Sequence, residues 1–270
     1  MIVSRRPRAQ LSPFIELLWA SHPPFSAQGG FRRELVLPTG SVHIAIRLDD
    51  RPLRLFENLE DVSGSSASFA VVGGARAAAY IKDVSEPVPT VGALVRPGAV
   101  RLVTGVPAFE FCGAHTPLGD LWGSAASELR DRLGEVAFPH ARLDLWEALL
   151  AARLPRVHGI HPAIAESISL LTRGAGVGTI VERIGYSHRH FINLFRDAVG
   201  LTPKLYGRVV RFSQVLDGLS IRPMASWADV AAEGGYADQP HFNRDFREFT
   251  GLSPERYGQL ATRGDYHVSV

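Results

Sequence analysis

Two segments of the sequence are rich in side chains that hydrogen bond to the edges of DNA bases. The residues are His188, Arg189, Ile192, Asn193 and Arg196 in the first segment, and Gln239, His241, Asn243, Arg244 and Arg247 in the second. Arginine suits guanine, Asn and Gln suit adenine, and an apolar side chain such as Ile192 suits the methyl group of thymine. We expect Arg196 and Arg247 to contact phosphate, which fixes register without reading sequence. The two segments therefore predict binding to double-stranded DNA.

An ordinary solvated helix surface would also be polar. For either segment alone, that alternative explains the pattern as well as DNA binding does. The occurrence of two similar segments favours the binding role, because a solvated surface has no reason to repeat.

The two segments belong to a repeated unit. Residues 191–207 match residues 242–258 at eight of seventeen positions when shifted by 51. Just upstream, Gly185-Tyr186 matches Gly235-Tyr236 at a shift of 50, so the second copy holds one extra residue. The chain therefore contains two copies of one supersecondary unit.

Each copy is typical of a helix-turn-helix unit, which we place at 178–199 and 226–250. In the first copy Gly185 ends one helix and Ser187 caps the next, and in the second copy Asp238 is the corresponding cap. Phenylalanines spaced by four residues mark the buried face of each second helix, and we interpret His190 as a packing residue. Apolar residues at helical spacing predict one long linker helix over 203–219, which would hold the two units in a fixed relation.

The first part of the chain predicts a different architecture. Up to residue 117 we expect short strands near 41–48, 52–57, 68–72, 78–82, 90–96 and 108–114, with a flexible loop at 63–68. This pattern favours an antiparallel barrel or sandwich. Two helices should follow over 118–156, where residues 120–154 could pair two subunits in a homodimer. We therefore predict an α+β chain of two domains, 1–156 and an all-α domain of 157–270.

Composition narrows the class of protein. The single cysteine, Cys112, excludes an internal disulfide, and we interpret it as a buried strand residue. Its spacing to His115 lacks the second ligand pair of a zinc site, so we expect no metal and no cofactor. Neither a signal peptide nor a membrane span is predicted, which indicates a cytoplasmic protein.

Charge is distributed unevenly, although the net charge of +2 is almost neutral. Residues 157–212 hold seven Lys or Arg and three acids, a balance of +4, whereas residues 213–270 hold five and eight, a balance of −3. A basic patch is the electrostatic footprint of DNA binding, so the first repeat should contribute more of it.

An enzyme or DNA-repair protein that uses the repeated unit for targeting is the alternative function. The sequence contains no nucleophile elbow, phosphate-binding loop, zinc-protease motif or dinucleotide fingerprint. Cys112 has no basic neighbour in sequence that would activate it as a nucleophile. We therefore expect no enzymatic activity.

Residues 161–260 resemble the DNA-binding domain of AraC/XylS-type transcription regulators. The most specific match is 235–257, GYADQPHFNRDFREFTGLSPERY. The resemblance implies base-reading positions at His188, Arg189, Ile192 and Asn193, and at Gln239, His241, Asn243 and Arg244. It also implies that RNA polymerase is a partner. Pro240 and Asp245 depart from the neutral or basic residues expected beside DNA, which suggests weaker specificity in the second unit.

The first 155 residues are similar, less specifically, to the amino-terminal sensor domains of such regulators. The likeness lies in LPTG (37–40), VRPGA (95–99) and LGDLWG (118–123). It implies dimerisation or the sensing of a small-molecule effector of unknown identity. His43, Arg47 and Glu34 are candidates to line a pocket, although an ordinary surface position is the simpler interpretation of each.

Overall fold

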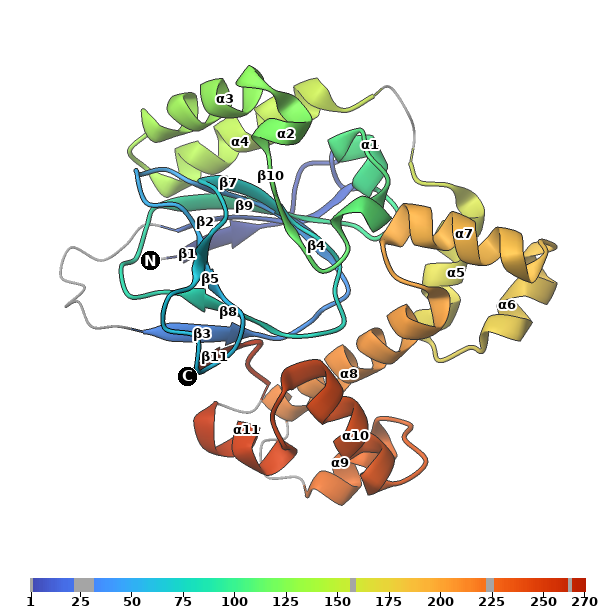
Figure 1. Cartoon of the computed structure of the whole chain (residues 1–270). Coiled ribbons are helices and arrows are strands. Elements are labelled where there is room, and N and C mark those ends of the chain that lie inside the picture. The colour runs from blue at the N-terminus through green and yellow to red at the C-terminus, as the bar shows by residue number, and fades with distance from the viewer. Residues whose placement is uncertain (1, 22–31, 156–158, 222–225, 262–263) are drawn as a thin grey trace.

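The computed structural model describes residues 2–21, 32–155, 159–221, 226–261 and 264–270. These residues form a sandwich of two antiparallel sheets, a pair of helices over one sheet, and a helical region to the side (Figure 1). The architecture is the α+β one predicted, and the open sheets make the first part of the chain a sandwich rather than a closed barrel.

The larger sheet has six strands. In spatial order they are β1 (Ile2–Arg5), β2 (Ile15–Ser21), β9 (Thr90–Val95), β4 (Val42–Arg47), β7 (Ala70–Gly73) and β10 (His115–Pro117). The second sheet has five strands, in the order β11 (His267–Ser269), β3 (Arg33–Val36), β8 (Tyr80–Asp83), β5 (Arg54–Phe56) and β6 (Ser65–Ser66).

Strand β4 shows why these residues form a half-buried sheet. Val42, Ile44 and Ile46 are each at most 2% exposed, because side chains alternate between the two faces of a strand. The intervening side chains, among them His43 and Arg47, keep partial exposure. The alternation read from the sequence therefore places His43 and Arg47 on the face opposite the apolar core.

Three predictions in this region are wrong. Residues 108–114 are not a strand: Ala108–Phe111 form a 3-10 helix, η1, which begins after Pro107, and Gly113 then turns the chain with a φ of 72°. Cys112 follows η1 and is exposed rather than buried in a strand. The loop predicted at 63–68 also contains strand β6, paired with β5.

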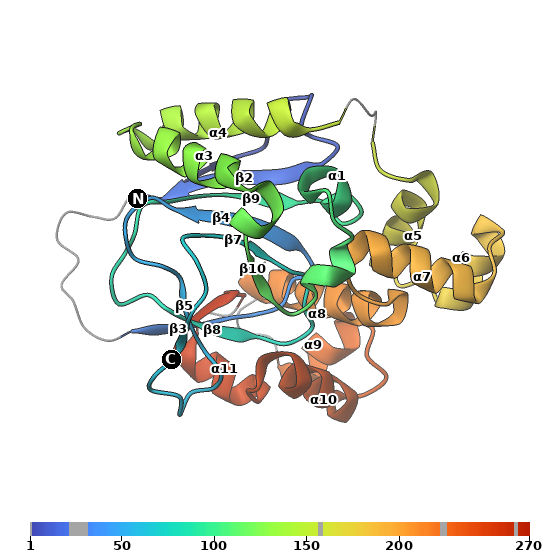
Figure 2. The same cartoon turned by 45° about the horizontal axis from the view of Figure 1, so that its top comes forward.

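Helices cover the outer face of the larger sheet (Figure 2). Short α1 (Val100–Thr104) and α2 (Gly119–Trp122) precede α3 (Ser124–Gly134) and α4 (Pro139–Arg153). Helix α4 packs on β1, β2 and β9, and its Glu147, only 5% exposed in its side chain, accepts a 2.7 Å hydrogen bond from Arg5. The apolar faces of α3 and α4 therefore serve this chain's own core.

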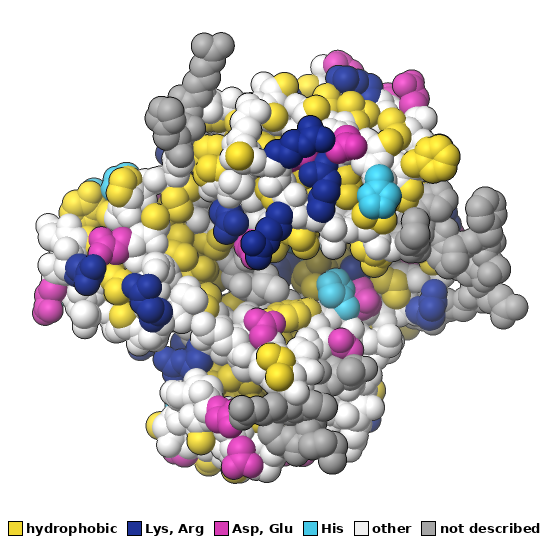
Figure 3. All heavy atoms as spheres, turned by 180° about the vertical axis from the view of Figure 1, so that it is seen from behind, with side chains coloured by type: hydrophobic (Ala, Val, Ile, Leu, Met, Phe, Trp, Pro, Cys, Tyr) yellow, Lys and Arg dark blue, Asp and Glu magenta, His cyan; other side chains and the backbone are white. Residues whose placement is uncertain are grey.

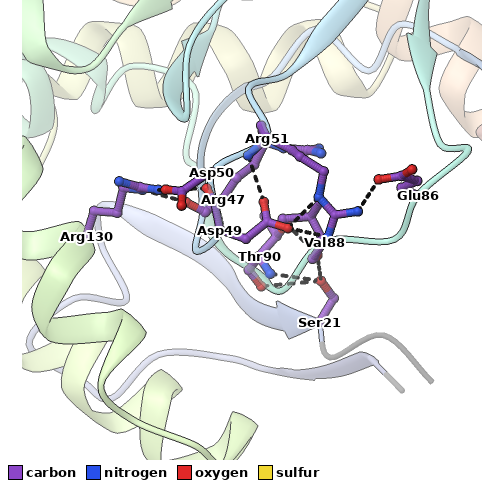
Figure 4. A network of polar contacts seen from close by, with 9 residues as sticks. All are labelled: Ser21, Arg47, Asp49, Asp50, Arg51, Glu86, Val88, Thr90 and Arg130. Atoms are coloured by element: carbon purple, nitrogen blue, oxygen red, sulfur yellow. Dashed lines mark hydrogen bonds and ion pairs between the residues drawn. The ribbon is translucent and has the colours of Figure 1, made fainter. Parts of the chain in front are cut away.

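A polar network holds the turn after β4 (Figure 4). The guanidinium of Arg130 in α3 donates to the carbonyls of Arg47 and Asp49, at 3.1 and 2.6 Å. The Nε of Arg47 in turn donates to the carbonyl of Arg51 at 2.7 Å. Arg47 therefore orders this turn, which is a structural role rather than the pocket-lining role considered from the sequence.

The helical region contains seven helices among the described residues. They are α5 (Pro162–Thr172), α6 (Val177–Ile184), α7 (His188–Val199), α8 (Pro203–Ile221), α9 (Trp227–Glu233), α10 (Gln239–Thr250) and α11 (Pro254–Leu260). Most of their buried apolar residues continue the core of the sandwich. The predicted boundary between residues 156 and 157 lies outside the described residues.

The chain ends in a strand that the sequence did not predict. Beyond α11, β11 pairs with β3 of the smaller sheet, and Val268 is 0% exposed there. His267 contacts the carboxylate of Glu34 at 2.9 Å, and Lys82 binds the same carboxylate at 2.7 Å. The last residues thus attach the helical region to the sandwich.

Candidate nucleic-acid interface

The first helix-turn-helix unit consists of α6 and α7. Gly185 ends α6 in the left-handed conformation, with a φ of 71°, and the hydroxyl of Ser187 accepts a hydrogen bond from the His190 amide at the start of α7. Phe191 and Phe195 are fully buried and hold α7 against the core. The glycine that ends α6, the serine that caps α7 and the buried phenylalanine face of α7 are all as the sequence predicts.

The opposite face of α7 carries the residues predicted to read bases. His188, Arg189, Ile192 and Asn193 are exposed, Ile192 at 36%. Within the described residues, none of the four makes a hydrogen bond or an ion pair. Their donors and acceptors are therefore available to a partner, and the exposed isoleucine has no role in the core.

The second unit consists of α9 and α10 and repeats this construction. The hydroxyl of Ser226 caps α9, and the carboxylate of Asp238 accepts from the His241 amide at 2.7 Å to cap α10. The shift of 51 residues aligns His188 with Gln239 and Arg189 with Pro240. The second unit thus has no counterpart to Arg189, while Arg244 and Arg247 are exposed.

The repeat aligns His241 with His190, and the two histidines have similar surroundings. The His241 ring packs edge-on against Tyr236, with the centroids 5.2 Å apart, and His190 packs in the same way against Tyr186 at 4.9 Å. The packing predicted for His190 therefore applies to both histidines. Asn243 is also partly buried, with an Oδ1 that has no partner among the described residues. Arg244 and Arg247 are the exposed members of the predicted second set, whereas Gln239 is half-buried.

Asp245 does not lie on the exposed face of α10, contrary to the sequence interpretation. It is 3% exposed, and its carboxylate pairs at 2.7 Å with Arg208 from α8. Arg208 also binds Glu248 at 3.0 Å. The acid thus belongs to the attachment of α10 to α8, and its charge is compensated inside the protein.

The two arginines predicted to contact phosphate differ in their surroundings. The guanidinium of Arg196 lies 5.7 Å from the centre of the Phe109 ring, which belongs to η1 of the sandwich. Arg247, its counterpart in the second unit, is exposed and has no such contact among the described residues. Arg196 is therefore at the junction between α7 and the sandwich.

Helix α8 connects the two units. Its aromatic contacts reach α7 and α10, the second helices of the two units, which we call the recognition helices. Tyr206 packs on Phe195 of α7, and Phe212 packs on Phe246 and Phe249 of α10, with ring centroids 5.4 to 5.5 Å apart. At 1.5 Å per residue, a helix of this length spans about 28 Å. That is close to the rise of one turn of DNA, about 34 Å.

Both recognition helices present their carboxyl ends to the sandwich. Gly200, which ends α7, lies against Ala75 and Ala108, and the Phe249 carbonyl near the end of α10 accepts a 2.7 Å hydrogen bond from the Ala79 amide. Residues 188–193 and 239–244 are consequently at the opposite, outward ends. In helix-turn-helix proteins the amino-terminal residues of the recognition helix are the ones that contact bases.

Comparison with known proteins identifies the class. Residues 180–259 match a family model described as a helix-turn-helix domain, and residues 4–117 match a domain of unknown function, DUF6597. A probable transcription factor of Proteus vulgaris, PqrA, is 30% identical over 94 residues, covering 35% of this chain and 76% of that protein. The fold and these matches define a DNA-binding transcription regulator.

The chain belongs to the AraC/XylS-type family of transcription regulators. It is thereby a regulator and not an enzyme.

Two solved structures are distant likenesses. ToxT of Vibrio cholerae is 11% identical, with a TM-score of 0.45, and the match covers 87% of this chain and 98% of ToxT. The carboxyl-terminal domain of AraT, a response regulator of Geobacillus stearothermophilus, is 15% identical, with a TM-score of 0.35, over 38% of this chain and 88% of that one.

Two features are absent from the part of the chain that the structure describes. No cluster of three or more His, Cys, Asp or Glu side chains could hold a metal ion there. No helix in that part of the chain is long and apolar enough to span a membrane.

Proposed function

We propose that this regulator inserts α7 and α10 into successive major grooves on one face of a promoter. The observation that carries the proposal is the pair of outward ends, residues 188–193 and 239–244, on two helices held by one spacer. Helix α8 supports it, because its aromatic contacts reach both α7 and α10 and hold them in a fixed relation. The exposed Arg189 and Asn193 suit guanine and adenine, so the first unit contributes most of the sequence preference.

Three further elements of the proposal concern partners. A small-molecule effector acts through the sandwich, and RNA polymerase is contacted at the promoter. A homodimer through residues 120–154 is also part of the proposal, and its surface is the polar outer side of α3 and α4 with the 75%-exposed Phe138. The cytoplasm is the expected location.

Selection of bound fragments from genomic DNA, followed by footprinting, tests the grooves and the reading residues. With purified full-length protein at near-physiological salt, we expect two protected stretches about ten base pairs apart on one face of the duplex. Affinity should fall steeply with rising salt, because phosphate contacts release counterions. A single protected stretch would contradict the two-groove arrangement, and the absence of enrichment over bulk DNA would contradict sequence-specific binding by the free protein.

A further inference from the structure

Arg76 is a cation with no acidic partner among the described residues. It lies in the segment that connects β7 to β8, and it is half-buried. Its guanidinium hydrogen bonds to the carbonyl of Ala114 at 3.0 Å, to the carbonyl of Gly74 at 3.5 Å and to Nδ1 of His115 at 3.3 Å. No carboxylate of the described residues pairs with it. A desolvated guanidinium without a carboxylate is costly, which points to an anion from outside the chain.

His115 provides a second donor without an acceptor. An arginine can only donate, so Nδ1 of His115 must accept, and the proton of the neutral ring is then on Nε2. Burial and the neighbouring charge of Arg76 lower the pKa of His115 to about 3, which keeps the ring neutral. Nε2 is buried and has no hydrogen-bond partner among the described residues. Buried polar groups nearly always have a hydrogen-bond partner, so Nε2 of His115 is expected to donate to an oxygen atom from outside the chain.

Tyr80 and His43 complete the cluster from two other strands. The guanidinium of Arg76 lies 4.3 Å from the centre of the Tyr80 ring, and the rings of Tyr80 and His43 lie 4.6 and 5.9 Å from that of His115. The Tyr80 hydroxyl and the ring nitrogens of His43 make no hydrogen bond within the described part of the chain. They are also not fully buried, because neither is among the enclosed unpaired atoms.

The backbone beside the cluster accommodates the His43 ring. Gly73 leaves room for the His43 ring, since a Cβ at this position would lie 2.1 Å from Cε1 of His43. On the surface seen from behind, basic and acidic side chains are interspersed (Figure 3). The nearby Lys82 does not add a free charge, because it pairs with Glu34. Arg76 therefore supplies the uncompensated positive charge of the cluster.

We propose that Arg76, Tyr80, His43 and His115 form a binding site for the carboxylate of a small organic acid. The planar guanidinium matches the two oxygens of a carboxylate, and the tyrosine hydroxyl is a neutral donor beside it. Carboxylate is favoured over the more highly charged phosphate, because one guanidinium compensates a single negative charge. The inference rests on the proposed function, in which an effector acts through the sandwich.

The same segment connects this site to both recognition helices. Ala75, next to Arg76, lies against Gly200 at the end of α7, and the amide of Ala79 donates to Phe249 near the end of α10. A carboxylate that draws in Arg76 changes the backbone between these two contacts. Occupancy of the site thus alters how α7 and α10 are held relative to each other, and so alters affinity for DNA.

Thermal unfolding of the full-length protein, with no DNA present, tests the site. The probes are sodium benzoate and sodium hexanoate at constant ionic strength, with benzamide and hexanamide as uncharged counterparts and inorganic phosphate as a different anion. We expect at least one carboxylate to raise Tm saturably by about 2 to 4 °C, as binding to the folded state alone requires, and the amides to have no effect. Stabilisation by phosphate alone, or by none of the probes, would overturn the proposal.

Three variants assign the effect to the site. Arg76→Gln and Tyr80→Phe should abolish or weaken the rise in Tm, whereas Arg101→Gln, at an exposed arginine of α1, should keep it. Each variant is compared with its own Tm in chloride, so a general loss of stability does not imitate a loss of binding. If carboxylate raises the Tm of Arg76→Gln as much as that of the wild type, Arg76 does not form the site and the proposal is wrong.

Binding to a selected DNA fragment, with and without the active carboxylate, tests the connection to the recognition helices. We expect the Kd to change at least threefold in the wild type and not in Arg76→Gln. An unchanged Kd despite carboxylate binding would overturn the coupling. Failure of the wild type to bind any selected fragment would instead contradict the proposed function, while the thermal measurement would still decide the anion site.

Discussion

The exposed face of α7 carries side chains that make no hydrogen bond or ion pair with the rest of the described protein. Arg189 and Asn193 are exposed and make no hydrogen bond or ion pair among the described residues, and Ile192 is an isoleucine left in solvent. A helix that served only the core would have little reason to carry this set. Pro240, in the place of Arg189 in the second unit, cannot donate a hydrogen bond from its side chain. Discrimination between bases should therefore depend most on α7.

Arg189→Ala should relax base preference at one position of the binding site. If Arg189 binds a guanine with both of its outer nitrogens, its loss should cost about 1 to 3 kcal/mol at that position, with a smaller effect on unrelated sequences. Fragment selection with the variant protein, followed by binding titrations on matched and single-base-changed duplexes, measures this. Arg101→Ala, at an exposed arginine of α1, is the control and should leave both affinity and preference as in the wild type.

Periodicity predicted the individual residues of α7 better than those of α10. The spacing of Phe191 and Phe195 places the opposite face outward, and the structure agrees. Spacing could not show that His241 packs on Tyr236 or that Asp245 pairs with Arg208, because both depend on contacts with other elements. The repeat could have indicated the packing of His241, because the shift of 51 residues aligns it with His190, whose packing role was predicted.

At the scale of elements, the ion pair between α8 and α10 holds the second unit in place. Asp245 is 3% exposed, so removing Arg208 leaves a carboxylate buried without its cation. Arg208→Met should destabilise the protein by about 3 kcal/mol, the lower part of the range for breaking a buried pair, because the side chain of Arg208 is itself 27% exposed. Chemical denaturation monitored by circular dichroism measures the change.

The double variant Arg208→Met/Asp245→Asn is the matched test of this explanation. It removes the buried charge together with its partner, so it should recover part of the stability lost in Arg208→Met. If the double variant is no more stable than Arg208→Met, the loss comes from the contact of the guanidinium with the Phe249 ring rather than from the unpaired carboxylate.

Local pattern predicted most elements and failed where tertiary contacts decide. The strand near 41–48 has a strict alternation that only one register can bury, and β4 follows it. Residues 108–114 have strand-like composition, but Pro107 and the turn at Gly113 allow only a short 3-10 helix that packs against α7. Strand β11 has three residues, and its partner β3 is more than 200 residues earlier in the sequence. No local signal could have located it.

At the scale of the whole molecule, the interior of the sandwich predicts sensitivity to acid. Burial and the charge of Arg76 lower the pKa values of His43 and His115 to about 3, with Lys82 contributing to both and His267 to His43. A lowered histidine pKa means that the unfolded state takes up protons first, below about 6.5, so stability is present above that pH and is lost as pH falls. With two such groups, the slope should approach about 2.7 kcal/mol per pH unit.

Urea denaturation at a series of pH values between 7 and 4.5 measures this slope. His115→Asn and His43→Gln should each reduce it by about half, because each removes one proton taken up on unfolding. His188→Gln, at an exposed histidine of α7, should leave it unchanged. A flat dependence of stability on pH in the wild type would mean that these two histidines titrate alike in the folded and unfolded states.

The C-terminal strand connects the two halves of the molecule, and its loss should separate them. Burial raises the pKa of Glu34, but the hydrogen bond from His267 and the charge of Lys82 outweigh burial and bring that pKa to about 2. Val268, fully buried against the sandwich, adds the apolar contact. Val268→Asp places a carboxylate in that contact, and an unpaired buried charge is not tolerated, so β11 should leave β3.

Hydrogen exchange of the full-length variant reports this separation. We expect faster exchange in β3 and β11, because their shared backbone hydrogen bonds open, with little change in the central strands β4 and β9. Ser269→Asp, at an exposed neighbour on the same strand, is the control and should retain wild-type protection. If Val268→Asp exchanges like the wild type, then β11 is not required to hold the helical region on the sandwich, and the contacts of α7 and α10 with residues 75–79 must be sufficient.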